Sequence, residues 1–123
     1  MSPSHILVVD DDGDSRELLC IVLEHEGYRV SQAASGEDAL QTVAVQVPDL
    51  VLLDVIMGGM DGYAVAARLK AQPLTQRVSI ILLTGLDDSS ARALAKAAGI
   101  NDVLTKPIDR HVLCARVRSL LTP

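Results

Sequence analysis

The chain has 123 residues, of which 49% are hydrophobic, 22% charged and 2% aromatic, and its 11 basic and 16 acidic residues leave a net charge of −5. This length fits a single domain spanning residues 1–123, and the absence of Phe and Trp implies an aliphatic core. The acidic balance argues against direct nucleic-acid binding, no apolar run is long enough to span a membrane, and we expect no secretory signal. The two cysteines do not make a disulfide framework, so we expect a reducing, cytoplasmic environment.

Short apolar runs alternate with amphipathic segments along the chain. Strands buried on both faces of a parallel sheet are predicted at 5–9, 50–53 and 80–83, with weaker candidates at 28–33 and 102–105. Helices are predicted between them, at 15–26, from Ser35 to before Pro48, at 62–71, at 91–98 and from Asp109 onward. Predicted helix caps are Ser35, Asp61, Asp109 and residues 87–89 at helix starts, and Gly27 and Gly99 at helix ends.

This order is a strand–helix unit repeated five times, which predicts an α/β fold with a parallel sheet covered on both sides. Right-handed crossovers leave few topologies. We expect a doubly wound, flavodoxin-like sheet of five strands in the order 2-1-3-4-5.

Polar residues follow the predicted central strands, at the edge where open α/β sheets bind ligands. They are Asp10, Asp11, Asp12, Asp54, Thr84 and Lys106. Clustered carboxylates repel one another unless one has a raised pKa or a cation lies among them, and Mg²⁺ prefers such oxygen ligands. Lysine and threonine can bind phosphoryl oxygens, and an aspartate can form an acyl phosphate. Together these residues predict a site at which an aspartate is phosphorylated.

Other acid-rich sites fit less well. An EF-hand starting at Asp10 would need Gly and Glu where Ser15 and Ile21 stand. A zinc site would need grouped ligands, whereas the three histidines are scattered. A phosphatase of the haloacid-dehalogenase type could use Asp10 and Asp12, but Asp14 stands where such enzymes have Thr or Val. We interpret Asp14 as an acid favoured at a helix N-terminus.

The chain resembles receiver domains of two-component response regulators over essentially its whole length. The stretches that carry the resemblance are 6–12, 52–57, 59–62, 82–84 and 104–107. The segment from 104 to 120 looks most like receivers attached to diguanylate cyclases.

The resemblance implies a role for each site residue. Asp54 would be the phosphoacceptor and Asp10 and Asp11 the acidic pair that binds Mg²⁺. Ile56 would supply a backbone carbonyl to the metal. Thr84 and Lys106 would bind the phosphoryl group. The donor would be a phosphohistidine on a sensor histidine kinase or phosphotransfer protein.

Phosphorylation would then reshape the face formed by the fourth helix, fifth strand and fifth helix, through which the domain would dimerise or dock a partner. Asp102 and Arg116 either pair on that face or are separately solvated charges. Ile56 and Leu86 place apolar side chains two positions after Asp54 and Thr84, and such side chains cannot orient an attacking water. Slow autodephosphorylation is therefore predicted.

The chain departs from the family pattern at a few positions. Gly58 replaces a frequent Pro, Gly85 an Ala, and Ile108 a frequent Phe. Val103 stands where receivers usually have a Tyr or Phe whose ring turns inward, and it has no ring to turn. Two alternatives to a signalling switch are an aspartyl-phosphate-forming phosphatase and a pseudo-receiver that only binds a partner.

Overall fold

A computed structural model describes residues 3–85 and 89–122. The elements are β1 (His5–Val9), α1 (Gly13–His25), β2 (Arg29–Ala33), α2 (Gly36–Val45), β3 (Leu50–Asp54), α3 (Gly62–Lys70), β4 (Ser79–Thr84), α4 (Ser89–Ala97), β5 (Asp102–Thr105) and α5 (Arg110–Leu121). The predicted alternation of strands and helices is confirmed. Within the described ranges, no helix combines the length and the apolar character needed to cross a bilayer.

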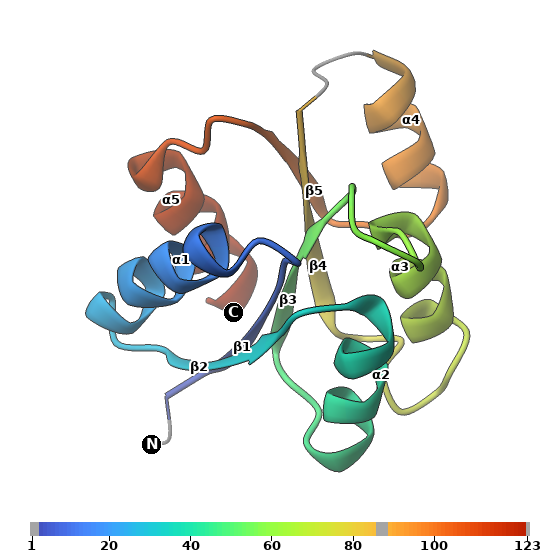
Figure 1. Ribbon diagram of the computed structural model, residues 1–123, viewed down its shortest axis with the longest axis horizontal. Helices are drawn as coiled ribbons and strands as arrows, with labels where there is room; N and C mark the ends of the chain where they lie inside the picture. The colour runs from blue at the N-terminus through green and yellow to red at the C-terminus, as the bar shows by residue number, and fades with distance from the viewer. Residues whose placement is uncertain (1–2, 86–88, 123) are drawn as a thin grey trace.

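The sheet is parallel, with strand order β2-β1-β3-β4-β5, as predicted (Figure 1). The central strands are paired in register, with Val9 opposite Leu53 and Leu53 opposite Leu82. Because all strands run the same way, the residues after β1, β3, β4 and β5 emerge at one edge, here called the carboxyl edge. The opposite edge, where the strands begin, is called the amino edge.

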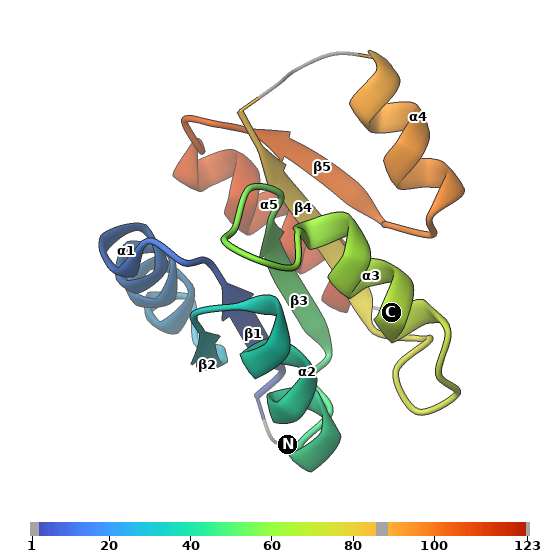
Figure 2. The ribbon, with the colours of Figure 1, turned by 45° about the vertical axis from the view of Figure 1, so that its right-hand side comes forward.

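Helices cover both faces of the sheet: α1 and α5 lie on one side, and α2, α3 and α4 on the other (Figures 1 and 2). Successive β1 residues alternate between the two layers, so Leu7 and Val9 contact the α2–α3 side and Ile6 and Val8 the α1–α5 side. All four are fully buried. Each such side chain contributes about 1.5–3 kcal/mol of burial free energy. The core is aliphatic, as the composition predicts.

Helix boundaries largely follow the predicted caps. Ser35, Asp61 and Asp109 each accept a backbone N–H at the start of α2, α3 and α5. The start of α1 differs from the prediction, because the helix begins at Gly13 rather than at residue 15. The carboxylate of Asp12 caps it by accepting the Asp14 N–H. The predicted opening of α4 at 87–88 lies outside the described residues.

A close approach fixes α3 against the end of β3. A Cβ atom added to Gly62 would lie 2.6 Å from the backbone oxygen of Asp54, so only glycine fits there without a shift of the backbone. The Gly62 N–H also donates to the carbonyl of Val55 at 3.1 Å. The first turn of α3 therefore holds the backbone that carries Asp54.

Candidate functional site at the carboxyl edge

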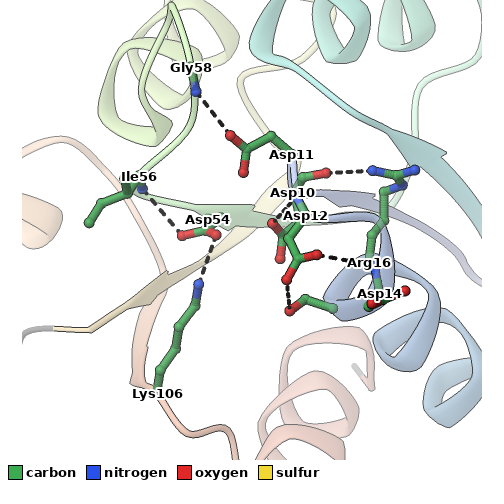
Figure 3. A network of polar contacts seen from close by, with 10 residues as sticks. Asp10, Asp11, Asp12, Asp14, Arg16, Asp54, Ile56, Gly58 and Lys106 are labelled. Carbon is green, nitrogen blue, oxygen red and sulfur yellow. Dashed lines mark hydrogen bonds and ion pairs between the residues drawn. The ribbon is translucent and has the colours of Figure 1, made fainter.

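Three carboxylates converge where β1 and β3 end (Figure 3). Asp10 and Asp54 are buried, with 1% and 5% of their surface exposed, whereas Asp11 is exposed. One oxygen atom from each lies within 4.8 Å of the others. Within residues 3–85 and 89–122, no other group of three or more such side chains could hold a metal ion. The pairing of β1 with β3 brings these acids together across 44 positions of sequence.

The environment of Asp10 disfavours its charge. Its Oδ1 accepts the Asp12 N–H at 3.0 Å, but its Oδ2 is buried and has no hydrogen-bond partner among the described residues. Burial is the main cause that raises the pKa of Asp10 above its usual value, and the charge of Asp54 raises it further. The Asp12 N–H and Lys106 oppose this shift. A cation bound among the carboxylates would satisfy the free oxygen and offset the repulsion.

Asp54 is held at both oxygen atoms. The Ile56 N–H donates to Oδ1 at 3.2 Å, and the Lys106 ammonium donates to Oδ2 at 2.8 Å (Figure 3). The Asp54 side chain is 7% exposed and that of Lys106 is 39% exposed, so the ammonium reaches the buried acid from solvent. The Lys106 N–H donates to the carbonyl of Thr84 at 2.7 Å, which fixes the chain just after β5.

Thr84 ends β4 at the same edge and is buried. In the sheet register Asp54 is opposite Leu83, and Thr84 is opposite Thr105. Thr84 therefore follows the residue that pairs with Asp54, and Lys106 follows the residue that pairs with Thr84. The predicted set of acids, threonine and lysine thus meets at one edge of the sheet.

The interaction of Gly58 was not predicted from the sequence. Its N–H donates to Oδ2 of Asp11 at 3.1 Å and links the loop after β3 to the loop after β1 (Figure 3). Proline has no N–H, so the replacement of the frequent Pro by glycine was the available signal.

Arg16 was also missed. It extends from α1 and donates from Nη1 to the backbone carbonyl of Asp10 at 2.8 Å (Figure 3). Its Nε donates to the side chain of Gln32, in β2, at 3.0 Å. The available signal was a cation near the amino end of a helix, where the helix dipole disfavours it.

Two further acids belong to α1 rather than to the cluster. Asp12 caps the helix and also accepts the hydroxyl of Ser15 at 2.9 Å. Asp14 lies in the first turn, which confirms its interpretation as a helix-terminal acid.

A groove of about 440 Å³ lies between α1 and the start of α5 and reaches Asp10 of the acidic cluster. Its lining is mostly apolar and includes Leu18, Leu19, Val22, Pro107, Ile108 and Leu113. Asp10 and Lys106 also line it. Leu18 lines this groove and is 63% exposed to solvent.

The fold and these side chains define a class of doubly wound α/β domains with acids, a threonine and a lysine where the parallel strands end. Residues 6–118 match the family model of the response regulator receiver domain, and the chain belongs to this family. The resemblance noted in the sequence is confirmed. Receiver domains of two-component systems are signalling switches that act with histidine kinases or phosphotransfer proteins, and phosphorylation and magnesium binding are typical of them.

Two curated relatives illustrate the match. The chain is 46% identical over 117 residues to the response regulator PleD of Caulobacter vibrioides, which covers 95% of the chain and 26% of PleD. It is 40% identical over 119 residues to the transcriptional regulatory protein AfsQ1 of Streptomyces coelicolor, which covers 97% of the chain and 51% of AfsQ1. The chain therefore spans only part of the length of these relatives.

Solved structures share the fold. The receiver domain of sensor histidine kinase PA1611 from Pseudomonas aeruginosa PAO1 superposes with a TM-score of 0.89 and 30% identity, covering 99% of this chain and 100% of that one. That structure has a magnesium ion coordinated in its active site cleft. Chemotaxis protein CheY4 of Vibrio cholerae gives a TM-score of 0.93 and 27% identity, covering 98% of this chain and 100% of that one.

Proposed function

We propose that residues 1–123 form one receiver domain in which Asp54 accepts a phosphoryl group from a phosphohistidine. The observation that carries this proposal is the position of the Asp54 carboxylate. It lies within 4.8 Å of the acids Asp10 and Asp11 on one side and 2.8 Å from the Lys106 ammonium on the other. An aspartate so placed is a nucleophile surrounded by groups that bind a metal ion and a phosphoryl group.

The residues fit a magnesium ion, because the buried Oδ2 of Asp10 has no partner among the described residues and the donor set is all oxygen. Asp10, Asp11 and Asp54 would hold the ion, with the backbone carbonyl of Ile56. Bound there, Mg²⁺ would neutralise charge on the carboxylates and on the transferred phosphoryl group.

In the proposed reaction, an Asp54 carboxylate oxygen forms a bond to phosphorus while the phosphorus–nitrogen bond of the phosphohistidine breaks. The electron pair of that bond returns to the imidazole nitrogen. The Lys106 ammonium donates to a phosphoryl oxygen, and the Thr84 hydroxyl donates to another. Positioning and charge neutralisation supply the catalysis.

The phosphohistidine would be carried by a sensor histidine kinase or a phosphotransfer protein. The groove between α1 and α5 supports this, because its apolar lining ends at Asp10 and Lys106. A donor segment seated there would place its phosphoryl group at the acids.

The output would be a change of the face formed by α4, β5 and α5, through which the domain would dimerise or dock a partner. Arg116 of α5 donates a hydrogen bond to the carboxylate of Asp102 in β5, so these two charges pair on that face. The domain would act as a switch that promotes its own phosphorylation and dephosphorylation rather than as an enzyme on external substrates. Two free, buried cysteines support a reducing, cytoplasmic location.

Incubation with acetyl phosphate, with and without Mg²⁺, tests the proposal by intact mass. We expect one phosphoryl adduct that requires Mg²⁺ and is absent from Asp54→Ala. Continuous turnover of the donor with no adduct on Asp54 would favour the phosphatase alternative. A folded protein with neither adduct nor turnover would favour a pseudo-receiver.

A further inference from the structure

The peptide groups of Asp10 are held from both sides. Its N–H donates to the carbonyl of Ala33 in β2 at 3.2 Å, and its carbonyl accepts Nη1 of Arg16 at 2.8 Å. Arg16 is itself anchored to β2, because its Nε donates to Gln32 at 3.0 Å. One side chain of α1 therefore connects the end of β1 to the edge strand.

These contacts leave a single free polar atom on Asp10. Its N–H, its carbonyl and its Oδ1 are all hydrogen-bonded, the last to the Asp12 N–H. Only Oδ2 lacks a partner within residues 3–85 and 89–122, and it is buried. A shift of the backbone at the end of β1 would displace this oxygen. Arg16 opposes such a shift because its guanidinium is bound both to the Asp10 carbonyl and to Gln32.

We propose that Arg16 is a positioning residue that sets the Asp10 Oδ2 for Mg²⁺ and uses Gln32 as its anchor. The inference rests on the proposed magnesium site. Removing a group that orients a metal ligand without touching the metal commonly weakens metal binding by about 10-fold or more.

The charge of Arg16 and its positioning role predict opposite changes in Mg²⁺ affinity when the side chain is removed. A cation near the carboxylates repels Mg²⁺, so if the guanidinium acted only through its charge, removing it would strengthen Mg²⁺ binding. If Arg16 acts by positioning, removing it weakens binding. Lysine retains the charge but lacks the fork, so Arg16→Lys separates the two roles.

Isothermal titration of the metal-free protein with MgCl₂ measures the affinity. We expect Arg16→Ala and Arg16→Lys each to bind Mg²⁺ about 10-fold more weakly than the unaltered chain, and Gln32→Ala to show a smaller loss. Arg68→Ala is the matched control, because Arg68 is an exposed arginine on α3, in the opposite helical layer. This control should bind as the unaltered chain does.

A second measurement separates positioning from a general loss of structure. Without Mg²⁺ the Arg16 variants should keep a single cooperative melting transition, at a lower temperature because the Asp10 carbonyl loses a charged donor. Their phosphorylation by acetyl phosphate should recover at saturating Mg²⁺. Normal binding by Arg16→Lys, tighter binding by Arg16→Ala, or slow phosphorylation at saturating Mg²⁺ would overturn the inference. Failure of the unaltered chain to bind Mg²⁺ would instead overturn the proposed function on which it rests.

Discussion

The two edges of the sheet use the same residue types in opposite ways. At the carboxyl edge, Asp54 lies among other acids and pairs with the Lys106 ammonium. At the amino edge, Asp49 accepts the backbone N–H of His5 at 2.7 Å, and the Lys70 ammonium donates to two backbone carbonyls within 3.0 Å. At the amino edge the polar side chains therefore form hydrogen bonds with backbone groups of the same chain.

The backbone around Asp49 is also fully engaged. Its N–H donates to the carbonyl of His5 at 2.8 Å, and its carbonyl accepts the Ser79 N–H at 3.2 Å, so it joins the starts of β1, β3 and β4. A group whose hydrogen bonds are made within the chain contributes stability and has little hydrogen-bonding capacity left for a ligand. A buried oxygen that has no partner in the described part of the chain, such as Oδ2 of Asp10, costs stability until a ligand satisfies it. Substitutions at the two edges should therefore differ in their effects on stability and on phosphorylation.

The largest difference is expected between the two lysines. Lys106→Met should slow phosphorylation by acetyl phosphate about 100-fold, because a group that stabilises developing charge is lost. Lys70→Met should leave that rate unchanged and lower the free energy of unfolding by about 1–3 kcal/mol, because two carbonyls lose a charged donor. Rates from intact mass and urea unfolding measure the two effects. A similar loss of rate in both variants would show that the edges are not functionally separate.

The two aspartates should affect stability differently in metal-free buffer. Asp49→Ala should lower the free energy of unfolding by about 1–2 kcal/mol, because the His5 N–H loses its acceptor. Asp54→Asn should not lower it, because removing a charge beside Asp10 relieves repulsion and Lys106 is exposed enough to be solvated. Urea unfolding with EDTA measures both. Equal destabilisation by the two changes would contradict this interpretation of the edges.

A smaller effect is expected at exposed apolar residues. Ile56, beside Asp54, is 74% exposed, and Leu74, in the loop before β4, is 65% exposed. Ile56→Asn should speed the loss of the phosphoryl group several-fold, because an amide can orient an attacking water. Leu74→Asn is the control and should not change the decay measured by intact mass. An unchanged decay rate in Ile56→Asn would count against the predicted role of Ile56; Leu86 lies outside the described residues.

The smallest expected effect is the pH dependence of stability that arises from His5, at the amino edge. Burial lowers the pKa of His5 below its usual value of 6.5, the Arg29 charge lowers it further, and Asp49 opposes the shift. Because the folded state binds the His5 proton less well than the unfolded state, the contribution of His5 to stability is greatest above pH 6.5 and decreases as the pH falls below it. The loss should be below about 1 kcal/mol between pH 7.5 and pH 5.5.

Urea midpoints at the two pH values, with EDTA present, test this prediction. His5→Gln should reduce the pH dependence, whereas His25→Gln should retain it, because His25 is exposed at the end of α1. If both variants keep the full dependence, another group is responsible.

The fold could be predicted because its signals are local and agree with one another. The run 50–53 is apolar throughout because β3 is buried on both faces, and Ser35, Asp61 and Asp109 cap helices where the sequence places them. Parallel topology then brings the residues after the strands to one edge.

Several contacts could not be predicted, because they depend on distances between segments. The bond from Arg16 to the Asp10 carbonyl depends on how α1 leaves β1, and the bond from Gly58 to Asp11 joins residues 47 positions apart. Asp49 precedes β3 and Asp54 ends it. Only the folded structure shows that the Asp49 carboxylate accepts a backbone N–H, that of His5.

The side chain of Val103 limits which movements of β5 are possible. It is 5% exposed in β5, opposite Leu82 of β4, at the position where receiver domains usually carry an aromatic ring. A β-branched side chain has few accessible rotamers and cannot exchange between a buried and an exposed orientation as a ring can. If Asp54 is phosphorylated as proposed, rotation of a side chain at this position would not carry the change, and Val103 would move only with the backbone of β5.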